Sequence, residues 1–271
     1  MTKKLNVGIL GIGRISNKHI LALKKNRNFF KILALCDNNN NKLNFNINAL
    51  KFKSLNQMLN KKLKLNLISI CTPSGLHKSH AIQCLKKGIN VLIEKPMALN
   101  AQECREMIAA CNKAGVKLSI GYRMHFEPTT QEIMRIAREK EYGEIRYVNA
   151  SAGFRGNFNS DHWKVLKKYG GGAMMDMGVY SLQATRYATG EEPISVSAQD
   201  LSRRTEKYEA EETVTFQVQF PSGAIGNGHT SFYEGVNHLY TKAQNGWYTL
   251  DPFSAYRGIK GDSSSGPLNY P

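Results

Sequence analysis

The sequence predicts an α/β fold in two parts: a doubly wound parallel sheet, followed by an α+β domain whose open sheet is mostly antiparallel. In the first part, short apolar runs alternate with segments of helical apolar spacing, which is typical of parallel sheets with crossover helices. A glycine turn separates the first run from the first helix. In the second part, several runs with two-residue alternation follow one another. The boundary falls after Tyr122, which gives domains of residues 1–122 and 123–271.

The first strand, expected over residues 4–10, leads into a glycine turn and then a helix. The motif is Gly-x-Gly-x-x-Ser, which ends at Ser16. The first glycine allows a tight turn, the second lets the backbone approach a pyrophosphate, and a small third residue lets the helix pack on the strand. The N-terminus of the helix supplies N–H groups for phosphate oxygens. The candidate phosphate-binding residues are Gly11, Ile12, Gly13, Arg14 and Ile15.

The second strand, expected over residues 30–37, ends at Asp37, which lies 21 residues beyond Ser16. An acid at this place accepts hydrogen bonds from ribose hydroxyls and repels a 2′-phosphate. Asp37, with Asn38 beside it, therefore favours NAD over NADP as the cofactor. The alternative interpretation is an aspartate that caps a helix or stabilises a turn.

The remaining elements of the first domain continue the alternation. Gly88 and Gly115 are expected to end two of the helices, because glycine readily adopts the left-handed conformation. In chain order we expect a helix over 53–59, a strand over 65–72, a loop over 73–77, a helix over 80–85, a strand over 91–93, a helix over 101–114 and a strand over 117–122.

The strand over 91–93 runs directly into Glu94, Lys95 and Pro96. Ligands of open α/β sheets bind just beyond the carboxyl ends of the strands. Pro96 holds Lys95 in an extended conformation, so the lysine side chain is aimed by rigid backbone. Lys95 is thus a candidate catalytic residue. The alternative is a strand that ends in a solvated pair of charges.

By its residue pattern, the second domain is expected to begin with a helix and to continue with strands of an antiparallel sheet. Alternation is clearest over residues 213–220, and the turn that follows them contains Gly223. The expected elements are a helix over 131–140 and strands over 144–151, 213–220, 224–230, 238–243 and 247–250, with a loop over 261–267.

Composition places the chain among soluble globular proteins, at 41% hydrophobic and 21% charged residues. No apolar run has the length of a membrane span, and a strand is expected almost at the N-terminus, which leaves no room for a signal peptide. The five cysteines form no Cys-x-x-Cys pair, which favours reduced thiols in a cytoplasmic protein. No metal site is predicted, because no set of ligand residues has a metal-binding spacing.

The formal net charge of +16 arises entirely in the first third of the chain. Residues 1–95 hold 18 lysines and arginines against two acids, Asp37 and Glu94, whereas residues 96–271 hold 19 of each sign. Nucleic-acid binding is disfavoured, because the lysines are spread over several elements without interleaved aromatic residues. A basic face that attracts an anionic cofactor explains the excess positive charge as well as nucleic-acid binding does.

The motifs occur in an order that resembles the glucose–fructose oxidoreductase and inositol dehydrogenase family (Gfo/Idh/MocA). In the first half the motifs are Gly11-x-Gly13, Cys71-Thr72-Pro73 to His77, Glu94-Lys95-Pro96, and Gly121-Tyr122-Arg123 with Phe126 and Pro128. In the second half they are Trp163-Lys164, Gly170-Gly171-Gly172 and Asp176-x-Gly178-x-Tyr180. The family usually has histidine where this chain has Tyr180. With a tyrosine at this position, the chain most resembles the glucose–fructose oxidoreductase branch of the family.

The resemblance implies an NAD(P)-dependent enzyme that transfers a hydride between a nicotinamide and a hydroxyl-bearing carbon of a sugar or polyol. The resemblance implies that Lys95, Asp176 and Tyr180 are catalytic. Tyr180 would take or give the proton of the substrate hydroxyl, and Lys95 would lower the pKa of Tyr180. Asp176 and Tyr180 are spaced i, i+4 on an expected helix, which places them on one face. The substrate residues are Lys95, Tyr122, Asp176 and Tyr180. Further cofactor contacts are expected from Thr72, Pro73, His77, Glu94, Lys95, Arg123, Trp163 and Lys164.

The resemblance also concerns partners and the C-terminus. In the family, the second-domain sheet covers the nicotinamide and forms the oligomer surface, so a homo-oligomer is expected. The family continues with helices past a Trp-x-x-Leu-x-Pro-like stretch, here residues 247–252, whereas this chain ends at Pro271. An incomplete second domain is therefore expected. The alternative function is a cofactor- or sugar-binding protein that has lost turnover.

Overall fold

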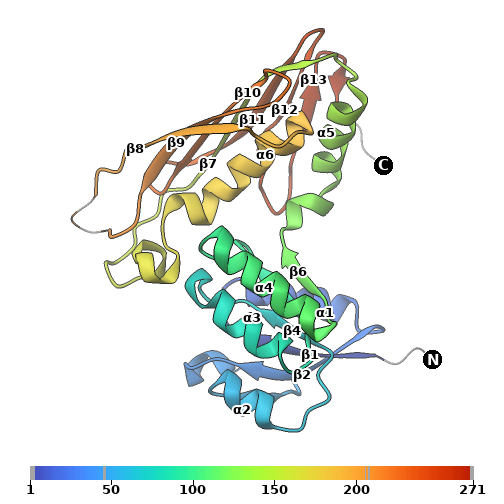
Figure 1. Ribbon diagram of the computed structural model, residues 1–271, viewed down its shortest axis with the longest axis vertical. Helices are drawn as coiled ribbons and strands as arrows, with labels where there is room; N and C mark the ends of the chain where they lie inside the picture. Colours follow the sequence, from blue (N-terminus) through green and yellow to red (C-terminus); the bar gives the residue numbers. More distant parts are fainter. Residues whose placement is uncertain (1–3, 45–46, 205, 207, 269–271) are drawn as a thin grey trace. The chain divides into compact units, whose positions relative to one another are not determined.

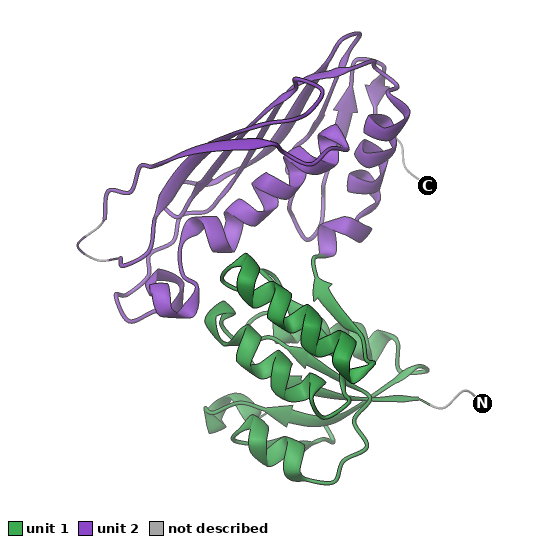
Figure 2. Ribbon diagram, in the orientation of Figure 1, with its two compact units in different colours: residues 1–122 green, residues 123–271 purple. Residues whose placement is uncertain are grey.

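The computed structural model describes residues 4–44, 47–204, 206 and 208–268. The chain divides into two compact units, residues 1–122 and 123–271 (Figure 2). Each unit is built around its own sheet.

The sheet of unit 1 has six parallel strands in the order β3-β2-β1-β4-β5-β6 (Figure 1). The order reverses between β1 and β4, which is where doubly wound sheets bind ligands. The predicted parallel sheet is confirmed. Its strands are β1 (Leu5–Leu10), β2 (Phe30–Cys36), β3 (Leu50–Phe52), β4 (Leu67–Ile70), β5 (Asn90–Glu94) and β6 (Leu118–Gly121).

The longest helix of unit 1, α4, begins and ends at capping residues. The Asn100 side chain accepts a hydrogen bond from the Glu103 N–H at 2.9 Å, and Gly115 ends the same helix in the left-handed conformation. These residues fix the predicted helix over 101–114. The elements are α1 (Ser16–Lys25), α2 (Leu55–Asn60), α3 (His77–Leu85) and α4 (Ala101–Ala114), with short 3₁₀ turns η1 (Asn40–Leu43) and η2 (Ser74–Leu76).

Both faces of the parallel sheet are buried. Ile9 packs in one apolar cluster with Ile12 and Ile20, whereas the next residue, Leu10, belongs to a second cluster that includes Met107. Successive residues of a strand point to opposite faces, so two clusters on one strand mean two covered faces. This explains why the strands of unit 1 are continuous apolar runs.

The sheet of unit 2 has eight strands in the order β14-β13-β12-β11-β7-β10-β9-β8. Every neighbouring pair is antiparallel except β7 and β10, which run parallel. The predicted mostly antiparallel sheet is confirmed. Its strands are β7 (Ile145–Gly153), β8 (Ser195–Asp200), β9 (Thr213–Gln219), β10 (Ile225–Ser231), β11 (Val236–Ala243), β12 (Trp247–Leu250), β13 (Gly261–Ser263) and β14 (Gly266–Pro267).

Helices cover one face of this sheet and leave the other open (Figure 1). Val148, Ala150 and Ala152 of β7 are fully buried on the covered face, and the residues between them are half-buried. The covering elements are α5 (Pro128–Glu139), a π-helical turn η6 (Met174–Gly178) and α6 (Val179–Thr189). Three 3₁₀ turns complete unit 2: η3 (Arg123–Phe126), η4 (Trp163–Val165) and η5 (Lys167–Tyr169).

Two parts of the second sheet differ from the expectation. The stretch 261–267, predicted as a loop, forms the β13–β14 hairpin that extends the sheet from β12. Strand β8 was not predicted, because all six of its residues are exposed and its sequence has little apolar alternation. It exists through backbone pairing with β9 at the edge of the sheet.

The described residues contain no helix that is both long and apolar enough to cross a membrane. All five cysteines are free thiols, and four of them are buried. Burial raises the pKa of the Cys36 and Cys84 thiols to about 12, so both are unreactive at neutral pH.

Gly228 in β10 makes room for an aromatic ring. A Cβ atom at this position would lie 1.9 Å from Cζ of Phe216, its partner on β9. The ring of Phe216 is buried and lies directly over the glycine. The strand pair can therefore hold a large side chain on its covered face only if the facing residue is glycine.

We predict that Gly228→Ala lowers the free energy of unfolding by about 2 kcal/mol, because the methyl group overpacks the Phe216 ring. Gly235→Ala is the matched control, since no described atom lies within 4 Å of a Cβ at that position. Chemical denaturation of both variants gives the measurement. Equal stabilities for the two variants would show that the ring does not depend on the glycine.

Candidate active site

The glycine turn after β1 has the two properties that the motif requires. Gly11 has a φ of +86°, and a Cβ there would come within 2.8 Å of the Cys71 carbonyl group and the Thr72 nitrogen. No described atom lies within 4 Å of a Cβ on Gly13. The first glycine is thus required by close packing on the end of β4, whereas the second leaves open space where a phosphate could approach the backbone.

Asp37 ties the end of β2 to this turn. Its Oδ2 accepts a hydrogen bond from the Ile12 N–H at 2.7 Å, and its Oδ1 accepts one from the Asn39 N–H at 2.8 Å. The interpretation of Asp37 as a turn aspartate therefore describes part of its role. Each carboxylate oxygen keeps a second lone pair, so ribose hydroxyls could still donate to Asp37.

The other residues predicted to contact the cofactor near this turn differ in their exposure. Ile12 does not fit the predicted cofactor contact well, because its N–H bonds to Asp37 and its side chain is buried in the core. Arg14 and Asn38 are exposed, and Ile15 is half-buried just before α1. For these last three, the predicted cofactor contact stays a prediction.

His77, predicted as a cofactor contact, is enclosed instead. Its side chain is 1% exposed, with Nδ1 lying 2.8 Å from the Pro96 carbonyl oxygen and Nε2 lying 2.9 Å from that of Thr72. Burial lowers the pKa of His77 despite these hydrogen bonds. The ring connects the loop after β4 to the segment after β5, and Thr72 and Pro73 are left half-buried at that loop.

Glu94 is held by a histidine that sequence reasoning missed. Nε2 of His19, in α1, lies 2.6 Å from Oε1 of Glu94, whose Oε2 accepts the Lys95 N–H at 3.2 Å. Burial opposes the charge of His19, but hydrogen bonds and charge interactions with Cys71 and Glu94 raise its pKa to about 10. No local pattern marks His19, because its partner lies 75 residues away. The half-buried Lys95 follows Glu94, and its peptide bond to Pro96 is cis.

In unit 2, the Asp176 segment is a π-helical turn rather than the expected α-helix. The four-residue spacing of Asp176 and Tyr180 therefore spans a π-helical turn that runs into α6, and their shared face stays a prediction. Tyr180 lies just beyond, in α6, and is 8% exposed. Gly172, before the turn, has a φ of +110°, and its Cβ would overlap the Glu211 carboxylate, which accepts the Met174 N–H at 3.0 Å.

The carboxylate of Asp176 pairs with the ammonium group of Lys164. The side chains are 15% and 21% exposed, respectively. Such a partly buried pair is strengthened by its low-dielectric surroundings. The resemblance implies a cofactor contact for Lys164 and a substrate contact for Asp176, and nothing in the sequence indicated their pairing.

Four aromatic rings surround this ion pair. The Lys164 Nζ lies 5.0 Å from the centre of the Phe154 ring, 5.6 Å from Trp163, 5.7 Å from Phe158 and 5.8 Å from Phe232. Each distance is within reach of a cation–π interaction. Trp163 was predicted as a site residue, whereas the phenylalanines were not, because apolar residues carry no sign of this role in the sequence.

Arg123 was predicted to contact the cofactor, but its guanidinium group binds backbone carbonyl oxygens of a loop in unit 2. Its Nη1 donates to the Ala255 carbonyl oxygen at 2.7 Å, and its Nη2 donates to that of Ser254. Its guanidinium lies 4.4 Å from the ring centre of Tyr256. Arg123 thus holds the loop at 254–256. Tyr122, just before it, is half-buried at the end of unit 1.

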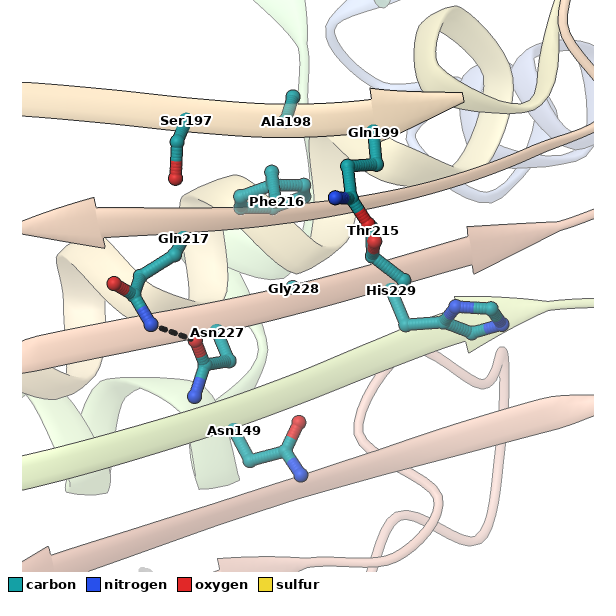
Figure 3. A pocket seen from close by; sticks show the side chains of 10 residues that line it. All are labelled: Asn149, Ser197, Ala198, Gln199, Thr215, Phe216, Gln217, Asn227, Gly228 and His229. Carbon is teal, nitrogen blue, oxygen red and sulfur yellow. Dashed lines mark hydrogen bonds between the residues drawn. The ribbon is translucent and has the colours of Figure 1, made fainter. Parts of the chain in front are cut away.

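A shallow hollow of about 450 Å³ lies on the open face of the second sheet (Figure 3). Gln217 and Asn227 face each other across neighbouring strands and are hydrogen-bonded at 3.0 Å. None of the predicted catalytic residues lines this hollow. Seven of its ten lining residues are polar: Asn149, Ser197, Gln199, Thr215, Gln217, Asn227 and His229. Within the described ranges, no three His, Cys, Asp or Glu side chains gather in a way that could hold a metal ion.

Two family models match the chain. The oxidoreductase family with an NAD-binding Rossmann fold matches residues 5–122, and the GFO/IDH/MocA C-terminal domain matches residues 130–245. The two matches fall on either side of the division between the compact units.

Relatives of known name agree with these matches. Trans-1,2-dihydrobenzene-1,2-diol dehydrogenase of Xenopus tropicalis is 30% identical over 207 residues, which are 73% of this chain and 61% of that protein. D-glucoside 3-dehydrogenase of Escherichia coli K12 is 27% identical over 252 residues, which are 84% of this chain and 70% of that protein. The chain spans 61% and 64% of the lengths of the two Xenopus dehydrogenases that it matches.

Solved structures share the fold. The aldose–aldose oxidoreductase of Caulobacter crescentus, complexed with glycerol, superposes with a TM-score of 0.90 at 30% identity, over 99% of this chain and 84% of that one. The WlbA dehydrogenase of Bordetella pertussis, complexed with NADH and UDP-GlcNAcA, gives a TM-score of 0.83 at 25% identity, over 92% and 74%. These similarities confirm the family resemblance, and the chain belongs to the Gfo/Idh/MocA oxidoreductase family.

Proposed function

We propose that this chain is an NAD(P)-dependent oxidoreductase that transfers a hydride between a nicotinamide and a hydroxyl-bearing carbon of a sugar or polyol. The relatives include diol and glucoside dehydrogenases and an aldose–aldose oxidoreductase. One observation carries the proposal: the glycine turn after β1, the Thr72 loop after β4 and Lys95 after β5 all follow carboxyl ends of one parallel sheet. That edge is where such sheets bind dinucleotides.

The residues of unit 1 fit a dinucleotide. The space beside Gly13 admits a pyrophosphate, and the N-terminus of α1 provides N–H groups for its oxygens. Asp37 would accept hydrogen bonds from the adenosine ribose and would repel a 2′-phosphate, so we propose NAD as the preferred cofactor. Lys95, Thr72 and Pro73 follow strands at the same edge. The exposed lysines of unit 1 would attract the negatively charged cofactor.

The proposed chemistry divides the work between cofactor and protein. A bound nicotinamide supplies the acceptor for the hydride that leaves the substrate carbon. Tyr180 takes the hydroxyl proton in the same direction, so that a carbonyl group remains. The role proposed for Lys95 is to supply a positive charge, because a positive charge favours the ionised form of a proton-accepting group. Asp176 accepts a hydrogen bond from the substrate, while Lys164 keeps the Asp176 carboxylate in place.

We also propose that the open face of the second sheet joins copies of this chain. Polar side chains of four neighbouring strands gather on this face (Figure 3). The proposal sets the reaction in the cytoplasm, where the five free thiols would stay reduced.

We expect Lys95→Met and Tyr180→Phe to lower kcat by at least about 10²-fold each, because each removes a group that acts on the transferred proton. Both variants should still bind the cofactor. Lys113→Met, on the exposed side of α4, is the matched control for the lost charge. Reduced nicotinamide is followed by absorbance with a panel of sugars and polyols, and cofactor binding by fluorescence.

Unchanged turnover in both variants would refute the catalytic roles. Cofactor binding by the wild type without any reduction would instead support the alternative, a binding protein without turnover.

Asp37→Ser should raise the ratio of kcat/KM for NADP to that for NAD by roughly 10-fold or more, because the carboxylate no longer repels a 2′-phosphate. The measurement is steady-state kinetics with each cofactor at saturating substrate. Thermal unfolding of the variant controls for the loss of the bond to Ile12. A ratio equal to that of the wild type would mean that Asp37 serves only the turn.

Gln217→Glu should weaken the proposed contact between copies, because two-fold related sheet faces would bring like charges together. Sedimentation equilibrium should find the wild type as an oligomer and the variant shifted toward a smaller species. A monomeric wild type would contradict the proposed surface.

A further inference from the structure

We propose that His19 and His77 are positioning residues that hold the chain on either side of Lys95 and thereby aim its side chain. The inference rests on the proposed function of Lys95. The residue before the lysine, Glu94, is bonded to His19, and the residue after it, Pro96, is bonded to His77. The two histidines come from different segments of unit 1, so Lys95 is held from two directions.

The His19 contact reaches from the glycine turn to the lysine backbone. His19 lies in the first turn of α1, three residues beyond Ser16. Its Nδ1 lies 2.8 Å from the hydroxyl of Ser69, a β4 residue that is 1% exposed. Glu94, on its other side, also accepts the Lys95 N–H. A continuous set of hydrogen bonds therefore joins β4, α1 and β5 to the main chain of Lys95.

The partners of His19 favour its charged form. The Glu94 carboxylate accepts an N–H from Nε2, and the Ser69 hydroxyl can accept a second N–H from Nδ1. The Ser69 oxygen lies 3.8 Å from the sulfur of Cys71 and can donate to it. Among described residues, the titratable groups that shift His19 are Glu94 and Cys71. Their effect raises the pKa of His19 despite its burial, which favours an imidazolium paired with Glu94.

The His77 contact joins two loops at the same edge of the sheet. One ring nitrogen faces the Pro96 carbonyl and the other faces that of Thr72. Burial lowers the pKa of His77, and the hydrogen bonds to these two carbonyls oppose that shift. His80 packs nearby, with its Nδ1 3.2 Å from the Thr72 hydroxyl, and burial lowers its pKa to about 4. Titratable groups around His77 are thus His80 and Glu94.

The position of the Lys95 side chain would therefore depend on the glycine turn and on the Thr72 loop. His19 follows the glycine turn and His77 follows the Thr72 loop, and both turn and loop are proposed to contact the cofactor. A catalytic group is effective only if its neighbours hold its geometry, and outer partners of this kind typically contribute 10-fold to 100-fold. Neither histidine needs to touch substrate or cofactor to exert this effect.

The test compares removal of each contact with its conservative replacement. His19→Leu and His77→Leu remove the hydrogen bonds, whereas glutamine at either position keeps one amide N–H donor. We expect each leucine variant to lower kcat by roughly 10-fold to 100-fold with little change in substrate KM. The glutamine variants should recover most of the loss. Circular dichroism and thermal unfolding check that each variant folds.

The Lys95→Met background separates positioning from general structure. In Lys95→Met, the further change His19→Leu should cause no additional loss of kcat, because effects through one residue are not additive. An additional loss as large as in the wild type would overturn the proposal. A fall in melting temperature without a fall in kcat would overturn it too.

A second readout does not require turnover. The rate at which an amine-reactive reagent labels Lys95, followed by mass spectrometry, should rise at least about threefold in His19→Leu, because a lysine held in place reacts less freely than a mobile one. Equal rates in the two proteins would overturn the proposal. If the wild type reduces no cofactor but the rates differ, the positioning stands and the proposed function fails.

Discussion

The bond between His19 and the Glu94 carboxylate is the interaction on which the candidate site of unit 1 depends. It joins the helix that follows the glycine turn to the strand that ends at Lys95. An ionised carboxylate that lies mostly out of solvent needs a charged or hydrogen-bonding partner, and the imidazolium supplies both. Loss of either partner would leave the other buried and unpaired, which usually costs more than the pair contributes.

A comparable arrangement occurs in unit 2. The Lys164 ammonium lies against the Asp176 carboxylate inside a shell of aromatic rings. The glycines before Asp176 let the chain pass close to Glu211 and enter a π-helical turn, a feature that is common at functional sites. In both units, a residue proposed for catalysis is therefore accompanied by an oppositely charged or hydrogen-bonded neighbour that fixes its surroundings.

Most of the fold was predictable from the sequence, because apolar periodicity and capping residues are local. The parallel sheet, the helix over 101–114 and the mostly antiparallel second sheet follow from such patterns. Strand β8 and the β13–β14 hairpin were missed, since they form by backbone pairing at sheet edges and bury few side chains. The π-turn was missed because it depends on contacts with Glu211, far along the chain.

The site was predictable only in part. The glycine turn, Asp37 and Lys95 could be identified from motifs, but what holds them could not. The contacts of His19, His77 and Arg123 join segments that are 19 to 132 residues apart, and a motif carries no record of them. His77 and Arg123 were accordingly assigned to the cofactor, although their polar atoms bond mainly to backbone carbonyls.

Formation of reduced nicotinamide by the purified chain is the most direct test of the central claim, that this chain oxidises a sugar or polyol with Lys95 at its catalytic centre. We expect the absorbance of the reduced cofactor to rise with NAD and at least one sugar or polyol, and Lys95→Met to abolish the rise while still binding NAD. An equal rise in wild type and Lys95→Met would contradict it.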